Sequence, residues 1–378
     1  MRLAWAEIRR TRGRYAAMAA TLALLVFLVL ILSALADGLY YGATGALRSA
    51  GADLYTFSAD SRQQFSRSSL PVADAAAIAS VPGVAAVGQV GTLLAAGRCI
   101  GRCRDGLIEL ALFGYLPGLP GGPDRAVEGR LPYRGELGVA AADISLQDNG
   151  VRIGDRIRVA GTTLSVRIVG FTSDSRYGLQ PTLWTTIATW RTAQAQARPE
   201  LAGGGDTVQA FAERLDNGAS PSATAAAIDA ALGARSATVD LQAAVLSLPG
   251  VREQRATLDQ IIYATLAVAG IVTALFFALI TLEKRMQLAL LKAIGASSRY
   301  LGASVIVQAA ILCVMGTALG VAVTRLVALV VPASVPLTFT AASTATAAVG
   351  TLVMGAIGAS LSFRRVARID PATALGGT

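Results

Sequence analysis

Long runs of apolar residues divide this chain into four candidate membrane spans and one large polar insert. A helix needs about 20 consecutive apolar residues to cross a bilayer. The segments that meet this requirement are residues 16–36, 258–282, 303–331 and 339–363. The first run is longer than the core of a signal peptide and has no convincing cleavage site, which favours an uncleaved span. The pattern predicts an α-helical membrane protein with four transmembrane helices.

The insert, residues 37–257, changes its hydrophobic period along its length, as a mixed α/β domain does. Residues 72–79 predict a helix that Pro82-Gly83 stops, with a strand after it. Residues 151–168 alternate apolar and polar positions on either side of Gly161, which predicts a hairpin with one buried face. The stretch "SATAAAIDAAL" predicts a second amphipathic helix. We therefore expect a mixed α/β extracytoplasmic domain.

Basic residues set the predicted orientation. The chain has 33 Lys and Arg against 24 Asp and Glu, a formal net charge of +9. This excess lies in residues 1–15 (+4), 283–302 (+3) and 364–378 (+2), which an even number of spans puts on one side. By the positive-inside rule that side is the cytoplasm. We predict a multi-pass protein of a bacterial cytoplasmic membrane with both termini cytoplasmic, and no nucleic-acid partner.

The same charges and hydrophobic spacing also predict the shorter segments before, between and after the spans. Residues 1–15 are predicted as a cytoplasmic amphipathic helix, 283–302 as a cytoplasmic coupling segment and 364–378 as a cytoplasmic tail. Residues 332–338, with Pro332 and Pro336, are predicted as the external turn between the last two spans.

Composition excludes several kinds of chemistry. The chain has no histidine, which removes imidazole bases, His-ligated haem and the commonest metal ligand. No catalytic set of residues is visible, so we expect no enzyme activity in this chain. The three cysteines are too few and too dispersed for a zinc site, and we expect no metal site. Cys99 and Cys103 lie near the turn of a predicted pair of strands and form either a local disulfide, which needs an oxidising compartment, or two free thiols.

Small residues recur at a spacing that lets membrane helices approach closely. Gly316 and Gly320 form one GxxxG pair in the third span, and Gly38 and Gly42 form another at the outer end of the first. In a chain this rich in Ala and Gly, such pairs are either helix-packing seams or chance matches. If the first span lies at a dimer interface, Gly38 and Gly42 are the better candidates for it.

Several stretches resemble one family. The order of spans, together with "WAEIRRTRGRY", "VPGVAAV", "VRIGDRIRV", "EKRMQLALLKAIGASSRYL" and "RRVARIDPATAL", resembles the permeases of the FtsX/MacB class of ABC transporters. Within that class the beginning of the chain and residues 258–301 look most like the haem-exporter (HrtB/DevC-like) permeases. The resemblance implies a homodimer of this subunit with two ATPase subunits, which would bind ATP and Mg, and an amphipathic exported substrate such as haem.

The stretch between the second and third spans carries the expected contact with the ATPase. Ala289, Leu290, Ala293 and Ile294 share one face of a predicted helix, and Lys284 and Lys292 lie largely off it. Such a helix can lie at the membrane surface and dock into a groove of an ATPase. The expected coupling residues are Lys284, Met286, Leu290, Lys292, Ile294 and Gly295, with the glycine as helix terminator. The alternative is a basic loop that only fixes topology.

A haem in a chain without histidine needs other ligands. Asp37, Tyr40, Tyr41 and Tyr263 are predicted near the external ends of the first two spans, and tyrosine is a known axial ligand. Their alternative role is the interfacial aromatic belt of a membrane protein.

The sequence thus supports three functions. The first is an export permease for an amphipathic substrate, with haem the leading candidate. The second is FtsX-like mechanical signalling to an external partner without transport, and the third is export of lipid or lipoprotein.

Overall fold

The computed structural model describes residues 12–101, 103–104, 106–201, 206–283, 286–287, 290, 294, 297–332 and 335–367. The chain forms two compact units. A helical unit comprises Met1–Gly38 and Arg255–Thr378, and a mixed domain comprises Leu39–Gln254. The predicted amphipathic helix at residues 1–15 lies mostly outside the described residues, as do Lys284, Lys292, Gly295 and most of the predicted tail.

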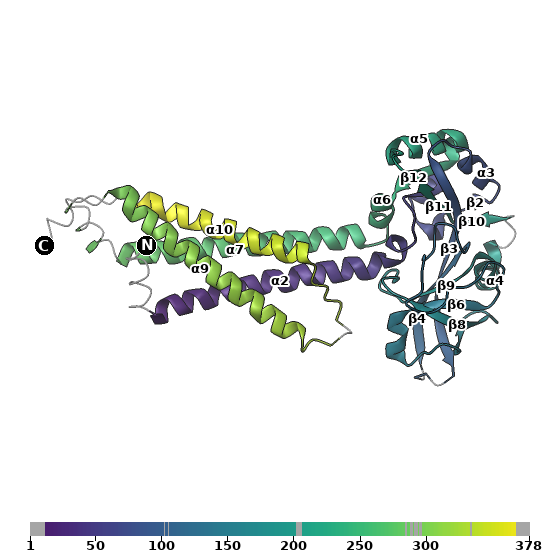
Figure 1. Ribbon diagram of the computed structural model, residues 1–378, viewed down its shortest axis with the longest axis horizontal. Helices are drawn as coiled ribbons and strands as arrows, with labels where there is room; N and C mark the ends of the chain where they lie inside the picture. Colours follow the sequence, from purple (N-terminus) through teal and green to yellow (C-terminus); the bar gives the residue numbers. More distant parts are fainter. Residues whose placement is uncertain are drawn as a thin grey trace. The chain divides into compact units, whose positions relative to one another are not determined.

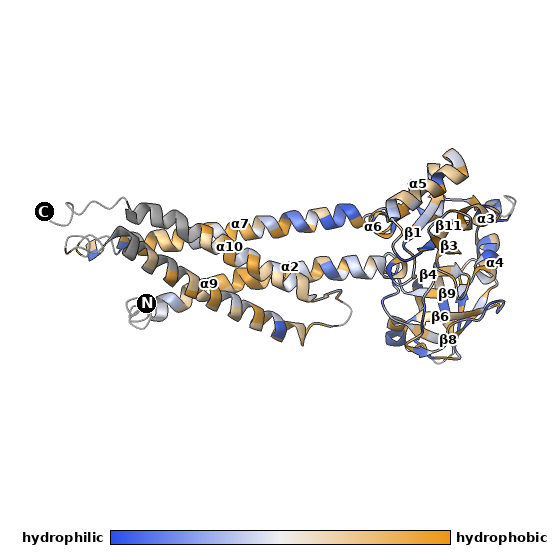
Figure 2. Ribbon diagram, turned by 45° about the horizontal axis from the view of Figure 1, so that its top comes forward, coloured by the Kyte–Doolittle hydropathy of each residue, from blue (hydrophilic) through white to orange (hydrophobic). Residues whose placement is uncertain are grey.

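Four long helices supply the described part of the helical unit (Figure 1). They are α2 (Arg12–Arg48), α7 (Val251–Glu283), α9 (Ser298–Ala328) and α10 (Ala341–Ala367). Apolar residues run along them, as the colours of Figure 2 show, and give way to hydrophilic ones in the first turns of α7.

Three of these helices are long and apolar enough to cross a membrane, over Tyr15–Arg48, Val251–Ile280 and Ala310–Ala328 of the described chain. These stretches and the family assignment below identify a membrane protein. The apolar part of α10, Ala341–Met354, is shorter, and the fourth span therefore stays a prediction.

Helix α9 packs on α2 through the two glycines of its GxxxG pair. A Cβ atom at Gly316 would lie 2.7 Å from Leu22 Cβ, and one at Gly320 would lie 2.7 Å from Val26 Cβ. Both distances are shorter than real Cβ contacts, so only glycine fits without movement of α2. Small residues thus allow these two backbones to approach closely.

The mixed domain contains twelve strands and several short helices in its described part. The strands are β1 (Leu54–Ser58), β2 (Leu70–Pro71), β3 (Val84–Ile100), β4 (Leu107–Tyr115), β5 (Glu128–Gly129), β6 (Val139–Asp143), β7 (Arg156–Val159), β8 (Ser165–Thr172), β9 (Thr182–Thr186), β10 (Thr207–Val208), β11 (Ala210–Leu215) and β12 (Ser236–Asp240). The α-helices are α3 (Asp74–Ala79), α4 (Ile187–Ala197), α5 (Pro221–Leu232) and α6 (Leu241–Leu246). The 3₁₀ turns are η1 (Ala59–Ser61), η2 (Phe65–Arg67), η3 (Ile144–Asn149), η4 (Pro199–Leu201) and η5 (Gly233–Arg235).

Most strands join one sheet in the order β12-β1-β11-β3-β4-β9-β6-β8-β5, and part of it closes on itself. Strand β7 pairs with both β3 and β8, so β3, β4, β9, β6, β8 and β7 form a ring of paired strands. The β4–β9 and β6–β8 pairs are parallel and the other pairs of the ring are antiparallel. Closure leaves these strands with few free edges.

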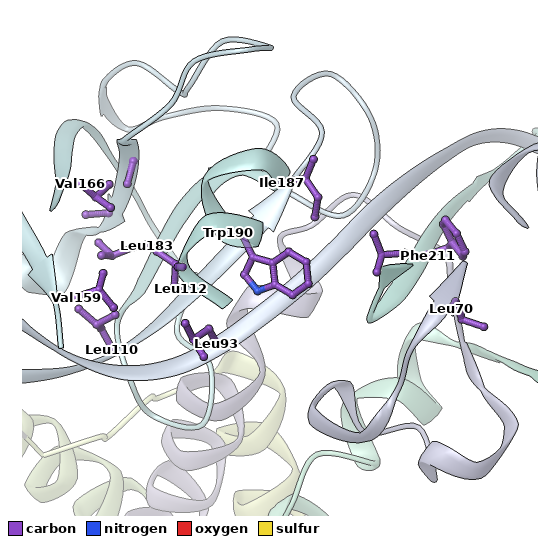
Figure 3. Close-up of a cluster of buried hydrophobic side chains, with 14 of the residues drawn as sticks. Leu70, Leu93, Leu110, Leu112, Val159, Val166, Leu183, Ile187, Trp190 and Phe211 are labelled. Carbon is purple, nitrogen blue, oxygen red and sulfur yellow. The ribbon is translucent and has the colours of Figure 1, made fainter. Parts of the chain in front are cut away.

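Alternating side chains from the ring point to two different apolar clusters. One cluster contains Leu110, Leu112, Val166 and Leu183 and extends to Trp190 of α4 (Figure 3). The other contains the intervening residues of the same strands, Phe113, Tyr115 and Trp184 among them, and packs against α6 and the last turns of α2. Because successive side chains of a strand point to opposite sides, the same strands contribute to two apolar layers.

Local predictions in the mixed domain are confirmed where a pattern was strong. The expected helix over 72–79 is α3, and "SATAAAIDAAL" lies in α5. The expected hairpin around Gly161 is β7 and β8, which pair antiparallel, with Gly161 at φ +76° in the turn. The predicted strands around the cysteines are β3 and β4, also antiparallel.

Candidate functional site: a cavity in the mixed domain

The mixed domain contains a cavity of about 530 Å³, here called the domain cavity. A volume of this size lies within the range of small-molecule sites, roughly 300–1,000 Å³. Its lining comes from segments far apart in the sequence. They are Ala43 of α2, residues 64–66, Thr92 and Leu94 of β3, residues 177–180, Arg198, Gln209, residues 248–250 between α6 and α7, and Val251 and Gln254 of α7. The cavity therefore lies where α2 enters the domain and α7 leaves it.

Aromatic and aliphatic side chains form about half of the wall. The Phe65 ring meets the Tyr177 ring edge to face, with centroids 6.2 Å apart, and both are buried. Burial raises the pKa of the Tyr177 hydroxyl above its ordinary value, so the phenol stays neutral. Two large aliphatic residues remain accessible at the cavity, Leu94 at 55% and Leu179 at 42% exposure. Apolar surface of this kind suits the body of an apolar or amphipathic ligand.

The polar part of the lining is mostly amides and hydroxyls. Gln209 is buried, and its Oε1 accepts hydrogen bonds from Thr92 N at 2.6 Å and from Thr92 Oγ1 at 3.1 Å. Gln180 Nε2 donates to Glu109 Oε2 at 3.4 Å. Arg198, at the C-cap of α4, is the one basic residue of the lining, and no Asp or Glu lines it. The described cavity wall is therefore partly apolar and partly lined by amides and hydroxyls, and it has a single positive charge.

The backbone on two sides of the cavity adopts a conformation that side chains rarely take. Leu179 has φ +70° and Gln63, next to the lining residue Gln64, has φ +60°. Leu179 N donates to Gly42 O at 3.2 Å, and Gln63 O accepts from Ser247 Oγ at 3.0 Å, which hold both conformations in place. Left-handed backbone at residues with side chains costs of order 1–3 kcal/mol and clusters at functional sites.

Asp37, a predicted haem ligand, is engaged in the helical unit. Its Oδ2 accepts a hydrogen bond from Thr340 Oγ1 at 2.9 Å, and Thr340 Oγ1 accepts from Ser343 N at 3.1 Å. Thr340 thus caps the N-terminus of α10 and ties it to α2. Thr338 N also donates to Ala34 O at 3.0 Å. Asp37 therefore has a structural role, and its role as a haem ligand stays a prediction.

The predicted tyrosines lie in different settings. In the mixed domain Tyr40 packs against the apolar cluster that contains Phe113, Tyr115 and Trp184, and the aromatic rings of Tyr40 and Tyr41 meet edge to face at 5.5 Å. The guanidinium of Arg48 lies 4.5 Å from the centroid of the Tyr41 ring and forms an ion pair with Asp174 at 2.6 Å. Tyr263, on α7 of the helical unit, is 68% exposed. Their role as haem ligands stays a prediction.

Three of the predicted coupling residues are described, and all are exposed. Met286, Leu290 and Ile294 are 60%, 58% and 76% exposed, and Ile294 N donates to Leu290 O at 3.1 Å. At a spacing of four residues they form one apolar stripe, here called the coupling stripe. Its contact with an ATPase stays a prediction.

The glycine pair at the end of the first predicted span faces this chain's own segments. A side chain at Gly38 would collide with Pro336 O in the helical unit. A Cβ atom at Gly42 would lie 3.1 Å from Leu179 Cδ2 in the mixed domain. Gly38 therefore has an intramolecular reason to be glycine, whereas at Gly42 a small movement of the Leu179 side chain would make room for a Cβ atom.

Cys99 and Cys103 are joined by a disulfide at the tip of the β3–β4 hairpin. Together with Asp155 they bring possible ligand atoms within 4.8 Å of one another. The disulfide leaves no thiolate for a metal ion, so this group does not fit a metal site while it is oxidised. Asp155 instead accepts a hydrogen bond from Arg152 N at 2.9 Å.

Sequence reasoning missed the domain cavity and its charged residue. Arg198 stands in a stretch with no motif, and it reaches the lining only because α4 ends there. One signal was available: beyond residue 36 the apolar positions Ala43, Ala46 and Leu47 keep helical spacing, so α2 continues to Arg48 and its last turns enter the domain core.

Two family profiles match the chain. One described as MacB-like periplasmic core domain matches residues 16–231, more than half of the chain. One described as FtsX-like permease C-terminal matches residues 261–371. The matches occur in the order in which the mixed domain and the later helices follow each other.

Curated relatives share moderate identity with the chain. A protein named "Putative hemin transport system permease protein HrtB" from Staphylococcus epidermidis is 30% identical over 131 residues, which is 35% of this chain and 37% of that protein. The match thus spans little more than a third of that relative's length. The protein of the same name from Staphylococcus haemolyticus is 23% identical over 380 residues, 100% of this chain and 99% of that protein. An uncharacterized ABC transporter permease of Mycobacterium tuberculosis, Rv0072, is 26% identical over 358 residues, 93% of this chain and 92% of that protein.

Solved structures with similar backbones are extracytoplasmic domains. The periplasmic region of MacB from Actinobacillus actinomycetemcomitans aligns over 52% of this chain and 92% of that chain, with a TM-score of 0.36 and 13% identity. The extracellular domain of the noncanonic ABC-type transporter YknZ from Gram-positive bacteria aligns over 50% and 98%, with a TM-score of 0.35 and 12% identity. The family assignment rests on the profiles alone.

Proposed function

Because this chain belongs to the family of ABC transporter permeases that join a MacB-like periplasmic core domain to an FtsX-like C-terminal region, we propose that it is the membrane subunit of an efflux system and that haem is its substrate. The single observation that carries the proposal is the pair of family matches, which together span most of the chain. Two relatives named for hemin transport support haem as the first substrate to test.

Energy for transport has to come from a partner. The family is that of ABC permeases, which work with an ATPase in general. The exposed coupling stripe of Met286, Leu290 and Ile294 is the surface we assign to that contact. An apolar helical stripe can dock into a groove of a partner protein. We expect two copies of this subunit and two ATPase subunits, in a bacterial cytoplasmic membrane with both termini cytoplasmic.

The cargo would enter between lipid and protein, and four oxygen-bearing residues are its candidate ligands. They are Asp37, Tyr40, Tyr41 and Tyr263, since tyrosine and carboxylate oxygens can ligate ferric haem and the chain has no histidine. Tyr263 is the most accessible of them, and Tyr263→Phe removes only the oxygen.

The test uses the complete chain with its ATPase in lipid nanodiscs. Hemin should stimulate ATP hydrolysis, and binding should shift its Soret band. Replacing Tyr263 with Phe, or Asp37 with Asn, should weaken that shift if the residue is a ligand. A complex that hydrolyses ATP but responds neither in rate nor in spectrum to hemin would exclude haem as the substrate.

The coupling stripe has a matched control beside it. Leu290→Asp and Ile294→Asp should leave hemin binding intact but abolish its effect on ATP hydrolysis, because a charge on the stripe disfavours apolar docking. Gln287→Asp places the same charge on an exposed neighbouring position off the stripe. Normal coupling in the stripe variants, or equal loss in the Gln287 variant, would contradict this assignment.

A second function, mechanical signalling without transport, has its own supporting observation. Helices α2 and α7 each contribute residues to both compact units, so a movement of the helical unit has a covalent route into the mixed domain. This function predicts ATP-dependent changes in protease sensitivity of the mixed domain with no cargo moved. Hemin accumulation inside vesicles that contain inverted complexes would decide for transport.

A further inference from the structure

The domain cavity has a composition that restricts its ligand. Large aliphatic side chains are normally buried, yet Leu94 and Leu179 both stay about half exposed at this one concave site. The Phe65 and Tyr177 rings extend the same apolar wall. Water alone would be a poor occupant of such a surface, so the wall fits the apolar body of a small molecule.

The charge of the lining is positive and unopposed. Within the part of the chain that the structure describes, Arg198 forms no ion pair. Glu109 Oε2 accepts a hydrogen bond from Gln180 Nε2 of the lining, and in the described chain it forms no ion pair with Arg198. A guanidinium presents paired N–H donors that match a carboxylate in shape and charge. The described lining therefore has a cationic group, Arg198, and no anionic group of its own to pair with it.

We infer that the domain cavity binds an amphiphile with a carboxylate headgroup, whose acid pairs with Arg198 and whose apolar body lies against Leu94 and Leu179. Haem, with its propionate groups, and long-chain fatty acids both belong to this chemical class. The inference rests on the proposed function in one respect, namely that the bound acid is the transported cargo. Binding itself does not depend on that function.

The backbone at Leu179 supports a role in binding. At φ +70° a glycine would be favoured over leucine, since a side chain in the left-handed region costs roughly 1–2 kcal/mol. A large apolar side chain is nevertheless present and points into an accessible cavity wall. A contact between the Leu179 side chain and a ligand would account for this strained backbone conformation.

The experiment uses the full chain in nanodiscs and a photoreactive long-chain carboxylic acid, with its methyl ester as the uncharged comparison. Crosslinked peptides are identified by mass spectrometry. The acid should label peptides that contain Leu94 or Leu179, and the ester should label them at least tenfold less. Arg198→Gln should lower labelling by the acid about ten- to a hundredfold, the range of a lost charge-assisted hydrogen bond, and leave labelling by the ester unchanged.

Two further variants keep the test decisive. Arg152→Gln removes the same charge from an exposed position outside the lining and should label like the native chain. Leu179→Gly relieves the left-handed strain, so the domain stays folded, and it should reduce labelling by acid and ester alike by several-fold. Equal labelling by acid and ester, or equal effects of the Arg198 and Arg152 variants, would overturn the inference.

The outcomes also separate this inference from the proposed function. If cavity labelling depends on Arg198 but hemin changes neither the ATPase rate nor the Soret band, haem is rejected as the cargo and the acid-binding site is supported. Hemin-stimulated ATP hydrolysis with labelling that ignores Arg198 would reject the acid site and keep the proposed function.

Discussion

Replacing Glu213 with glutamine should abolish most of the pH dependence of the mixed domain's stability between pH 4.5 and 8. Glu213 lies on β11 between β1 and β3, fully buried, and neither carboxylate oxygen accepts a hydrogen bond of good geometry within the described residues. Burial raises its pKa to about 8, the Thr56 hydroxyl acts in the opposite direction, and the nearby Asp229 carboxylate raises the pKa further. The folded domain therefore holds this side chain protonated at neutral pH.

The sign and size of the effect follow from proton linkage. Between pH 4.5 and 8 the folded domain keeps a proton that the unfolded chain has released, so stability falls as pH rises through this window. At about 1.4 kcal/mol per pKa unit the full loss is at most about 5 kcal/mol, and roughly 3 kcal/mol is lost between pH 4.5 and 7. Glutamine stays neutral throughout, so its stability should not follow this slope.

Thermal unfolding of the full chain, followed by circular dichroism at a series of pH values, measures the difference. A change of 3 kcal/mol corresponds to roughly 6–12 °C in the unfolding temperature of a domain of this size. We expect the gap between Glu213→Gln and the native chain to widen by about that amount from pH 4.5 to 7. The chain has no histidine, so imidazole titration does not mask the slope.

Glu200 supplies the control. It is exposed on the η4 turn, and Glu200→Gln should leave the pH dependence unchanged. Tyr55, which interacts with Glu213, does not titrate in this window because burial raises its pKa well above its ordinary value. A Glu213→Gln chain with the native slope would refute the reasoning, as would a native chain whose stability rises with pH.

Three further predictions concern packing. Gly320→Leu should destabilise the helical unit in detergent by roughly 1–3 kcal/mol, because its side chain would overlap Val26 of α2; thermal unfolding of the purified chain measures this. Thr340→Val should cost about 1–2 kcal/mol, since α10 loses its cap and Asp37 loses its donor, and Thr340→Ser should restore both. Cys103→Ser should lower the stability of the mixed domain by about 2 kcal/mol, and a reducing agent should produce the same loss in the native chain and none in the variant.

The helix-packing prediction has a matched control in the same unit. A Cβ atom at Gly13 of α2 would meet nothing within 4 Å, so Gly13→Ala should be neutral or slightly stabilising. Alanine and leucine both favour a helix more than glycine does, so helix propensity cannot explain a loss of stability in Gly320→Leu. Equal destabilisation by Gly13→Ala would mean that the loss does not come from the contact between α9 and α2. An unchanged unfolding temperature in Gly320→Leu would contradict the close packing of α9 on α2.

Local pattern predicted the elements well because their signals are short-range. The alternation around Gly161 and the small-residue helix in residues 221–232 each depend on fewer than about 20 neighbouring residues, and both are present. The sequence predicted a membrane span over residues 16–36 but not how far its helix continues beyond the span. The continuous apolar run ends at residue 36, but α2 continues to Arg48. Its last turns bury Ala43, Ala46 and Leu47 in the mixed domain.

The domain cavity and Glu213 could not be predicted in this way. Thr92 and Gln209, which bond at the cavity, are 117 positions apart, and only the sheet order brings them together. Arg198 is one of 33 basic residues, and nothing beside it in the sequence marks it. Glu213 alternates in phase with Phe211 and Leu215 on β11, so it shares their buried face, and an acidic side chain at such a position gives no local signal that it is buried. The Thr92–Gln209 contact, the position of Arg198 and the burial of Glu213 all depend on contacts between segments far apart in the sequence.

The place of β1 in the sheet has a consequence for biosynthesis. Its two neighbours, β11 and β12, are the last strands of the domain to be made: β1 ends at residue 58 and β11 begins at residue 210. A ribosome adding roughly 5–20 residues per second needs on the order of ten seconds to produce the chain between them. During that time the nascent β1 has neither of its partner strands, so this part of the sheet can form only after β11 and β12 have been made.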